Sequence, residues 1–442
     1  MNWGLFVAFI SALIGPPPWQ SIDAINLATV DIRTVAQPAW LQQRLAADPQ
    51  AAAILKRYIQ ALEAAGFSPD LQGVMVGVGP YAIASHQPDR RLPAASLTKM
   101  ATTLAAVETY GLAHQFVTEV GWRGALTNGV LEGDLIVKGA YDPLFVWEEG
   151  IALGNALEQL GIQHVTGKLI IVDRFVMNFE TDPLLAGQLL RQSMDSDRWN
   201  REIESQYRTL GPDTGRPSLQ IRGGVELAPS SAIEPAVWQL RHHSLPLVAI
   251  LKAMNIYSNN VMADMLTDLV GGSAGVIRAA EQAGVVPGDI SLINGSGLGE
   301  DNQMSARAAV TVALALQERL RSQGLTFADI FPVVGADRGT LDDRSLPDHA
   351  ALKTGSLAVV SALAGAVPTE AKGVVWFATV NYGSGLATLR RQQDRLLNEL
   401  VSHWGQPAQV PAAIQPTVRF NQGPYRLGDP LRNERISTGT GD

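Results

Sequence analysis

Residues 115–239 carry a residue pattern that differs from the patterns on both sides of them. Segments such as 133–137 and 167–172 are short apolar runs preceded by glycine, which is typical of β-strands joined by turns. Apolar residues at helical spacing occupy 96–107 before this stretch and return at 245–269 after it. A chain arranged in this way builds one domain from two separated segments, with the residues between them as an insertion.

The two flanking segments together contain helices and strands in the order of a mixed domain. The sequence predicts an α+β fold, with an antiparallel sheet flanked by helices, over residues 30–114 and 240–405. A β-rich inserted domain at 115–239 interrupts it. The expected strands are a pair within 73–85 and single strands at 350–354, 358–367 and 373–382, and the other expected helices are 38–65, 305–321 and 386–401.

The two ends of the chain differ from the rest. An apolar run from Trp3 to Ile14 is stopped by a glycine and three prolines, and it is too short to span about 30 Å of hydrocarbon as a helix. Its length and position fit the apolar part of a secretory signal within residues 1–23, although no basic residue precedes it. A buried N-terminal segment is the alternative. Residues 406–442 are rich in proline and predict a flexible tail.

Composition excludes several classes of function. Lys and Arg number 34 against 42 Asp and Glu, a net charge of −8, so the basic surface of a nucleic-acid-binding protein is not expected. The chain has no cysteine, which excludes disulfides, thiolate metal sites and a cysteine nucleophile. The adjacent His242 and His243 do not form a metal-binding pattern, and we expect both to be surface residues.

Ser96 and Lys99 form an S-x-x-K sequence at the start of a predicted helix. Residues three apart on a helix share a face, so the Ser96 hydroxyl and the Lys99 amine can meet. A serine becomes a good nucleophile when a base takes its proton, and a lysine can be that base if burial or a second cation lowers its pKa. By itself the same spacing is also common on solvated helix faces.

Two further triplets could contribute to the same site. Residues 258–260 (Ser-Asn-Asn) follow a break in the helical pattern, where Ser258 could relay a proton and Asn260 could hold a substrate amide. Residues 353–355 (Lys-Thr-Gly) lie in a predicted strand, where a cation and a hydroxyl could bind a carboxylate. Gly355 would leave room for a substrate backbone.

The three motifs occur in the order typical of penicillin-binding proteins and class A β-lactamases. Over residues 54–404 the chain resembles the class C low-molecular-mass penicillin-binding proteins, which are D-alanyl-D-alanine carboxypeptidases and endopeptidases of serine type. Residues 257–266, 294–298 and 339–341 are similar to further motifs of that family. The resemblance implies a β-lactamase/DD-peptidase-like domain, with a helical subdomain, interrupted by an insertion.

The resemblance also implies roles for the motif residues. Ser96 would attack the carbonyl between two terminal D-alanines, with Lys99 as general base and Lys353 as the second cation that lowers the Lys99 pKa. Ser258 would pass a proton to the leaving amine, while Asn260 would hold the substrate amide. The residues implied for the substrate carboxylate are Lys353 and Thr354, and those implied for the oxyanion hole are the backbone N–H groups of Ser96 and Ser356.

Two more substrate contacts are implied by the same resemblance. Asp173 and Arg344 would bind the charged end of a diaminopimelate side chain; an ordinary surface pair is the alternative interpretation. The distance from Ser96 to Ser258 is shorter than in larger family members, which indicates that an accessory domain is reduced. Asn259 stands where the family has aspartate, at a position expected to be non-catalytic.

The resulting prediction is an exported DD-peptidase, in the periplasm or at the extracytoplasmic face of a bacterial envelope. It would act on peptidoglycan stem peptides, accept β-lactams as covalent inhibitors, and need neither a metal nor an organic cofactor. Its N-terminal segment could associate with a membrane surface. Two alternatives stay open. One is a peptidoglycan-recognising scaffold without hydrolytic activity, and the other is a β-lactamase or esterase on the same fold.

Overall fold

A computed structural model describes residues 48–233 and 236–436 of the chain. The predicted signal-like segment at 1–23 lies outside the described residues. The predicted N-terminal helix is present as α3 (Pro49–Ala64), which Asp48 caps by accepting a hydrogen bond from the Ala51 backbone N–H at 2.9 Å. Within the described residues, none of the helices combines the length and the apolar character that a membrane-spanning segment needs.

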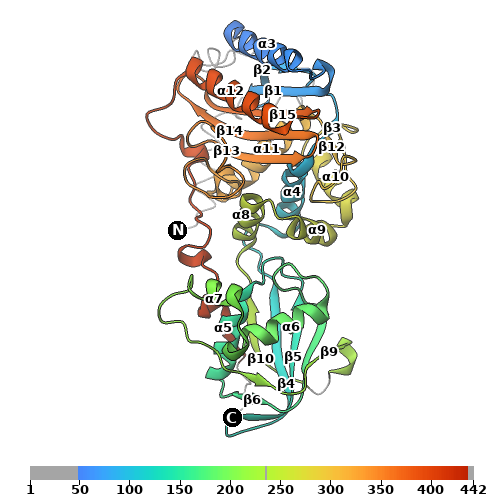
Figure 1. Cartoon of the computed structure of the whole chain (residues 1–442), viewed down its shortest axis with the longest axis vertical. Helices are drawn as coiled ribbons and strands as arrows, with labels where there is room; N and C mark the ends of the chain where they lie inside the picture. Colours follow the sequence, from blue (N-terminus) through green and yellow to red (C-terminus); the bar gives the residue numbers. More distant parts are fainter. Residues whose placement is uncertain (1–47, 234–235, 437–442) are drawn as a thin grey trace, which may run out of the picture. The chain divides into compact units, whose positions relative to one another are not determined.

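An antiparallel sheet of five strands forms the centre of the main domain (Figure 1). Its strand order is β13-β14-β15-β1-β2, so strands from the two ends of the sequence are neighbours and β13 is an edge strand. The long alternation predicted after residue 350 is therefore confirmed. The strands are β1 (Gln72–Val78), β2 (Tyr81–His86), β13 (Ala351–Leu357), β14 (Val360–Thr369) and β15 (Gly373–Tyr382).

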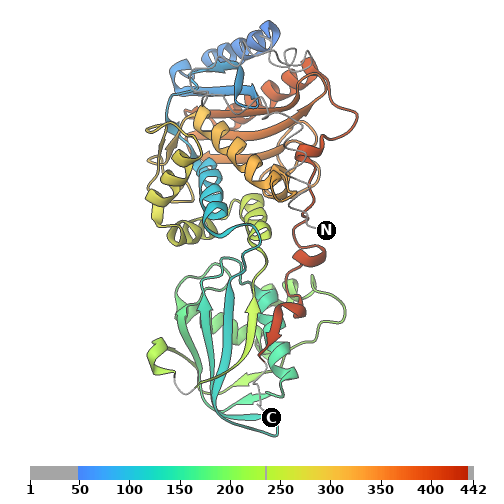
Figure 2. The same cartoon turned by 180° about the vertical axis from the view of Figure 1, so that it is seen from behind.

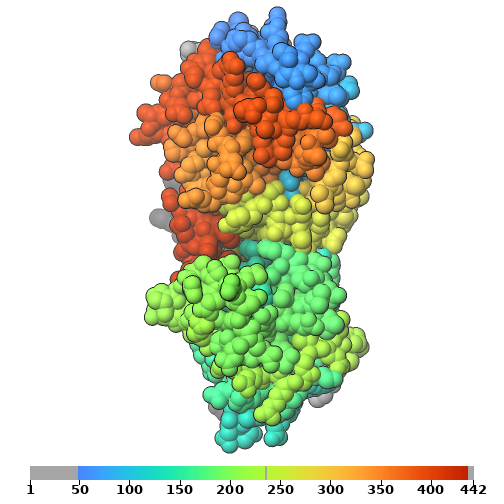
Figure 3. Space-filling view, in the orientation of Figure 1, coloured from blue at the N-terminus to red at the C-terminus, as the bar shows by residue number. Residues whose placement is uncertain are grey.

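Helices α3 and α12 (Leu386–Trp404) cover one face of this sheet, and their side chains lie next to each other in Figure 3. Successive strand residues point to opposite faces, so Leu352 of β13 and Phe377 of β15 pack into the core beneath these helices. Burial of such side chains contributes about 1.5–3 kcal/mol each, which makes apolar packing the main stabilisation of this layer.

A helical layer covers the other face of the sheet (Figure 2). Its core includes Ala351, Trp376 and Ala378, which alternate with the residues that face α12. Three short strands form a separate small sheet: β3 (Leu92–Pro93), β11 (Ile290–Ser291) and β12 (Gln303–Met304). The helices are α4 (Thr98–Tyr110), α8 (Leu247–Tyr257), α9 (Asn260–Leu269), α10 (Gly272–Gln282) and α11 (Ala306–Arg321).

The block between α4 and α8 has its own mixed sheet and its own hydrophobic core, and we propose it as the inserted domain. Besides strands it contains three helices, because parallel pairs such as β5 with β7 need crossover connections. The strands are β4 (Val117–Thr127), β5 (Val130–Ala140), β6 (His164–Val165), β7 (Leu169–Arg174), β8 (Gln220–Ile221), β9 (Val225–Ala228) and β10 (Val237–His243), and the helices are α5 (Trp147–Gln159), α6 (Pro183–Ser193) and α7 (Arg201–Tyr207).

The prediction of a flexible tail over 406–442 is wrong for the part that the structure describes, up to Ile436. This segment contributes β16 (Asn433–Arg435), which pairs with β10 of the inserted block (Figure 2). Its Val418 backbone N–H donates to Asp329 at 2.6 Å, and its Arg432 forms an ion pair with Glu149 at 2.6 Å. Proline fixes its backbone φ angle at a value that suits extended segments and the first positions of short helices. A proline-rich segment can therefore be ordered, and we call residues 406–436 the C-terminal strap.

The prediction that His242 is a surface residue is also wrong, because its side chain is buried. Its ring Nδ1 lies 2.9 Å from the Asn433 side-chain oxygen of β16, and its Nε2 lies 3.5 Å from Glu149. Burial lowers the pKa of His242, which favours the neutral ring. The histidine is part of the contact between β10 and the C-terminal segment.

Candidate active site

Ser96 lies in a short 3-10 helix (Ala95–Leu97) that leads directly into α4. The preceding Ala95 has a left-handed backbone with φ 48°, a conformation that costs free energy in a non-glycine residue. Lys99 follows one helical turn later, and its Nζ lies 2.9 Å from Ser96 Oγ. The spacing argument is confirmed for this pair: nucleophile and base candidates share a helix face and touch.

The Lys99 amine is buried and has three oxygen neighbours. Besides Ser96 Oγ, it contacts Asn260 Oδ1 at 2.8 Å and the Ser296 carbonyl at 2.7 Å. A charged ammonium has three N–H donors and would use all of them here. A neutral amine can give its two hydrogens to Asn260 and Ser296, which leaves its lone pair directed at the Ser96 hydroxyl. The arrangement therefore suits a lysine that accepts the serine proton.

Burial lowers the pKa of Lys99 to about 7, and the negative charge of Asp264 acts in the opposite direction. Burial has this effect because the charged form loses its water shell. A base with a pKa near 7 is partly neutral at physiological pH, which is what general-base catalysis requires.

Asp264 is a site residue that the sequence analysis did not assign. It lies one turn after Asn260 on α9, and its Oδ1 accepts hydrogen bonds from the backbone N–H groups of Gly295 at 3.1 Å and Ser296 at 2.9 Å. These bonds hold the loop whose Ser296 carbonyl contacts Lys99. The spacing of four residues from Asn260 was an available signal, since such residues share a helix face.

Ser258 and Asn260 lie at the break between α8 and α9. Ser258 ends α8 in the left-handed conformation (φ 52°, ψ 40°), and Asn260 is the first residue of α9. Asn259 is the N-cap of α9, where its side chain accepts a hydrogen bond from the Met262 N–H at 3.0 Å. Asparagine and aspartate are both good N-caps, so Asn259 has a structural reason to stand where the family has aspartate.

Lys353 approaches from β13 on the sheet face that carries Ala351. Its buried Nζ donates to Ser258 Oγ at 2.9 Å and to the Thr354 carbonyl at 2.8 Å. Burial, and then the charge of Lys99, lower the pKa of Lys353 well below its usual value. Burial is the largest cause at both lysines, and the role of Lys353 as a second cation that lowers the Lys99 pKa stays a prediction.

Gly355 has a structural role beside the predicted one. A Cβ at this position would meet the Ala94 carbonyl at 2.7 Å and the Ser96 backbone nitrogen at 3.1 Å. The missing side chain therefore makes room for the backbone that precedes α4, and glycine lets the edge strand pack directly against Ser96. Room for a substrate backbone at this position stays a prediction.

Thr354 and Ser356 alternate with Lys353 and Gly355 along β13, so they belong to the face that α12 covers. Thr354 is almost buried, and the Ser356 hydroxyl accepts a hydrogen bond from Arg390 of α12 at 2.8 Å. Their binding of a substrate carboxylate, and an oxyanion hole formed by the N–H groups of Ser96 and Ser356, stay predictions.

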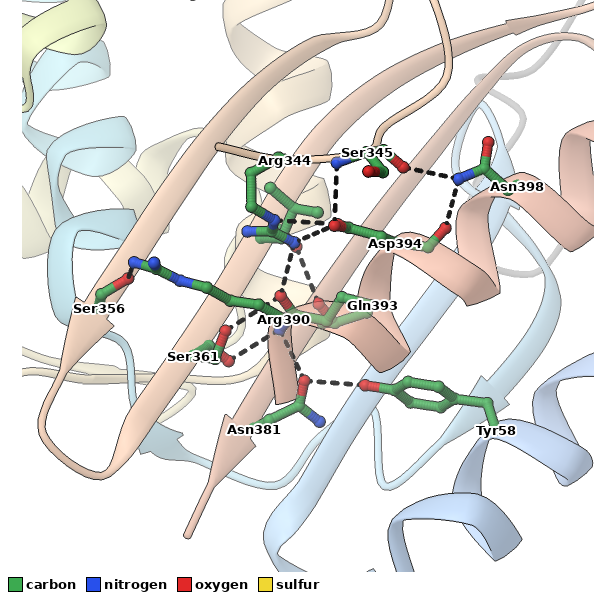
Figure 4. Close-up of polar contacts among 12 residues, drawn as sticks. Tyr58, Arg344, Ser345, Ser356, Ser361, Asn381, Arg390, Gln393, Asp394 and Asn398 are labelled. Carbon is green, nitrogen blue, oxygen red and sulfur yellow. Dashed lines mark hydrogen bonds and ion pairs between the residues drawn. The ribbon is translucent and has the colours of Figure 1, made fainter. Parts of the chain in front are cut away.

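The predicted substrate contact at Arg344 is contradicted by its surroundings. Its side chain is 4% exposed and forms an ion pair with Asp394 at 2.6 Å, with Gln393 as a further acceptor at 3.1 Å (Figure 4). The guanidinium is thus already neutralised inside the domain. Asp173 is exposed at the end of β7 and accepts a hydrogen bond from the Ser230 hydroxyl at 2.6 Å, so its role stays a prediction.

Other sequence patterns find ordinary places in the fold. The G-x-S-x-G pattern at 271–275 spans the start of α10 directly after α9, rather than the strand-to-helix turn that a nucleophile elbow needs. Within residues 48–233 and 236–436, no cluster of three or more His, Asp or Glu residues could hold a metal ion.

The fold, together with the contact between Ser96 and Lys99 at the edge of its sheet, defines a class, the β-lactamase/DD-peptidase-like proteins. The structure is similar to that of a predatory peptidoglycan endopeptidase from Bdellovibrio bacteriovorus, with a TM-score of 0.67 and 20% identity, covering 83% of this chain and 98% of that one. Penicillin binding protein 4 (dacB) from Haemophilus influenzae gives a TM-score of 0.57 and 19% identity, over 75% and 96% of the two chains.

The sequence profile of the D-Ala-D-Ala carboxypeptidase 3 (S13) family matches residues 59–181 and 215–400, and the chain belongs to this family. Carboxypeptidase DacB of Mycolicibacterium smegmatis is 29% identical over 161 residues, which are 32% of this chain and 35% of the relative. A D-alanyl-D-alanine carboxypeptidase of an Actinomadura species is 33% identical over 199 residues, 39% of this chain and 36% of the relative. The match thus spans about a third of each of these relatives.

Proposed function

We propose that this protein is a serine-type D-alanyl-D-alanine peptidase that cleaves peptidoglycan stem peptides through an acyl-enzyme. The observation that carries the proposal is the contact of Ser96 Oγ with the buried Lys99 amine at 2.9 Å. Membership of the S13 family and the similarity to a D-alanyl-D-alanine carboxypeptidase support the choice of substrate.

In the first half of the proposed reaction, Ser96 attacks the carbonyl carbon between two D-alanines as its proton passes to Lys99. Asn260 and the Ser296 carbonyl hold the two hydrogens of the neutral amine during this step. The tetrahedral intermediate then collapses, the carbon–nitrogen bond breaks, and the leaving amine takes a proton from Ser258. Ser258 in turn receives the proton that Lys99 took from Ser96, so Ser258 is a hydroxyl and Lys99 is neutral again when the acyl-enzyme has formed. That hydroxyl accepts a hydrogen bond from Lys353, so its own proton is free to be given.

In the second half, water attacks the ester carbonyl on Ser96, and Lys99 takes a proton from the water as base. The ester bond breaks, Ser96 recovers a proton, and the shortened peptide leaves. A β-lactam would follow only the first half, which would leave a stable acyl group on Ser96. The similar Bdellovibrio endopeptidase has been solved in a penicillin G acylated form, which supports β-lactams as inhibitors here.

Labelling with a fluorescent penicillin tests the proposal. Wild-type protein should form a covalent adduct, the Ser96→Ala variant should form none, and a Ser361→Ala variant, which removes another buried serine hydroxyl of the domain, should label like wild type. Release of D-alanine from a pentapeptide ending in D-Ala-D-Ala should accompany labelling, and Lys99→Ala should be nearly inactive. Equal labelling of Ser96→Ala and wild type would contradict the assignment of the nucleophile.

The two other candidate functions give different results in the same assays. A peptidoglycan-binding scaffold would bind the pentapeptide without releasing D-alanine. A β-lactamase would turn over the penicillin rapidly instead of keeping it as an adduct. We further propose export to the periplasm or the extracytoplasmic face of the envelope, where stem peptides occur, with any membrane association through the N-terminal segment.

A further inference from the structure

Arg390 of α12 extends beneath the central sheet to its edge strand. Its Nη2 donates to Ser356 Oγ at 2.8 Å, and Figure 4 shows the side chain stretched from the helix to Ser356 on β13. Ser356 directly follows the Lys-Thr-Gly triplet. A guanidinium from the α12 face thus reaches the part of the edge strand whose other face carries Lys353.

The charge of Arg390 is not neutralised by a neighbour. Among the residues that the structure describes, it forms no ion pair, and its buried Nε has no hydrogen-bond partner. By contrast, Arg344, which contacts the same helix, forms an ion pair with Asp394. Arg395, which belongs to that helix, forms an ion pair with Glu399. A half-buried cation without an anion is costly, and an unsatisfied buried donor in a native protein calls for an explanation.

The hydrogen bond from Arg390 also determines what the Ser356 hydroxyl can do. A serine hydroxyl has one hydrogen to donate and two lone pairs that can accept. Because one lone pair is engaged by Arg390, the hydroxyl hydrogen is available to an acceptor at the strand edge. The edge thus offers a hydroxyl donor backed by a guanidinium on one face and the Lys353 amine on the other.

We propose that Arg390 is a specificity-determining residue that, together with Ser356, recognises the free carboxylate next to the leaving amine. This inference rests on the proposed function. A carboxylate would supply the missing negative charge, and charge-assisted hydrogen bonds from arginine are stronger than those between neutral groups. The substrate class is a peptide with a carboxylate on the residue after the scissile bond, and the site discriminates against the corresponding amide.

The test compares two acylated peptides that end in D-Ala-D-Ala, one with a free C-terminal carboxylate and one with a C-terminal amide. In Arg390→Ala, kcat/KM for the acid should fall about 10- to 100-fold, the effect of losing a hydrogen bond to a charged group. For the amide, kcat/KM should change less than about threefold, since a neutral group gains little from the charge. Arg390→Lys should retain part of the preference for the acid, because it keeps the charge but loses the planar fork.

Arg391→Ala is the matched control, because Arg391 is exposed on the same helix and donates only to Thr388. It should leave both kcat/KM values unchanged. An equal loss for acid and amide in Arg390→Ala would overturn the inference, because a purely structural residue would affect both substrates alike; unchanged values for both would overturn it as well.

Acylation by benzylpenicillin and by its methyl ester provides a second readout, and Arg390→Lys replaces the alanine variant if that one folds poorly. Arg390→Ala should slow acylation by the acid and not by the ester. Failure of the wild-type protein to hydrolyse the acid peptide would instead refute the proposed function. The two failures are therefore distinguishable. Failure of the proposed function is seen in the wild-type protein, whereas failure of the inference about Arg390 is seen only in the acid-to-amide ratio of the Arg390→Ala variant.

Discussion

The carboxylate of Asp264 accepts a hydrogen bond from the backbone N–H of Ser296 at 2.9 Å, and this contact sets the position of the Ser296 carbonyl. That carbonyl accepts a hydrogen bond from Lys99 at 2.7 Å. Asp264 therefore acts on the candidate base in two ways: it positions one of its three hydrogen-bond partners, and its negative charge raises the Lys99 pKa against the effect of burial.

Replacement of Asp264 should separate these two effects. Asp264→Asn keeps an oxygen that can accept both backbone N–H groups but removes the charge, so the Lys99 pKa should fall and the acid limb of the pH–rate profile should move to lower pH. Asp264→Ala should also lower the acylation rate, by about tenfold or more, since the loop loses hydrogen bonds to a charged group. Rates of penicillin acylation between pH 5 and 9 measure both effects. An unchanged acid limb in Asp264→Asn would contradict the electrostatic role.

The activity of the wild-type protein should depend on pH through Lys99. The base is active when neutral, so the acylation rate should decrease about tenfold per pH unit below its pKa of about 7 and level off above it. Stopped-flow acylation by a penicillin gives the profile, and a melting curve at each pH shows whether the fold is retained. A flat profile from pH 5 to 8 with intact protein would exclude Lys99 as the titrating base.

Gly355→Ala should impair the site by changing how the edge strand β13 packs against it. The new Cβ would lie 2.7 Å from the Ala94 carbonyl, so β13 and the backbone at Ser96 have to move apart. We expect about 1–3 kcal/mol of lost stability from overpacking and at least a tenfold slower acylation. Gly73→Ala, in β1 of the same sheet, is the control, because its Cβ would meet its nearest neighbour, the Gln87 carbonyl, at 3.5 Å, an ordinary contact. Equal acylation rates for the two variants would refute the close-packing role.

Arg344→Ala should affect stability and not substrate choice. The variant leaves Asp394 inside the domain without its ion-pair partner, at a cost of about 3–5 kcal/mol in the free energy of unfolding. Urea denaturation measures the loss, and Arg395→Ala, which removes an exposed pair with Glu399, should cost less than about 1 kcal/mol. The relative activity on stem peptides with charged and uncharged third residues should stay the same. A selective loss of activity on the charged peptide would instead support Arg344 as a substrate contact.

The C-terminal strap offers a fifth test. Arg432→Ala removes the ion-pair partner of the buried Glu149, with an expected cost of about 3–5 kcal/mol in the free energy of unfolding. Arg435→Ala, in the strand β16 that directly follows Arg432, loses only a hydrogen bond from an exposed side chain to the Gln159 carbonyl and should cost less than about 1 kcal/mol. Urea denaturation of both variants compares them. Similar midpoints would indicate that the strap does not stabilise the protein.

Sequence patterns predicted those parts of the site that depend on spacing along one element. The interval from Ser96 to Lys99 is one helical turn, and the break after Tyr257 exposes Ser258 and Asn260 at a helix junction. Alternation predicted the strands of the central sheet. Such features are local, because helix and strand periodicities determine which side chains share a face.

Four features depended on contacts between segments far apart in sequence. Arg344 lies in a motif-like segment but is neutralised by Asp394 of α12, and Arg390 reaches Ser356 across the sheet. The C-terminal strap and the buried His242 are explained by the pairing of β16 with β10. Neither composition nor spacing reports where such partners lie.

By itself, the sequence predicted the two-segment domain and determined the serine–lysine pair and the family motifs, because each depends on residue type and short-range periodicity. Only the tertiary structure decided which charges are neutralised, that burial lowers the pKa of both Lys99 and Lys353, and why Gly355 lacks a side chain. The physical reason is that the pKa of a group and the room for a Cβ depend on the burial and close packing of neighbours that only folding brings together.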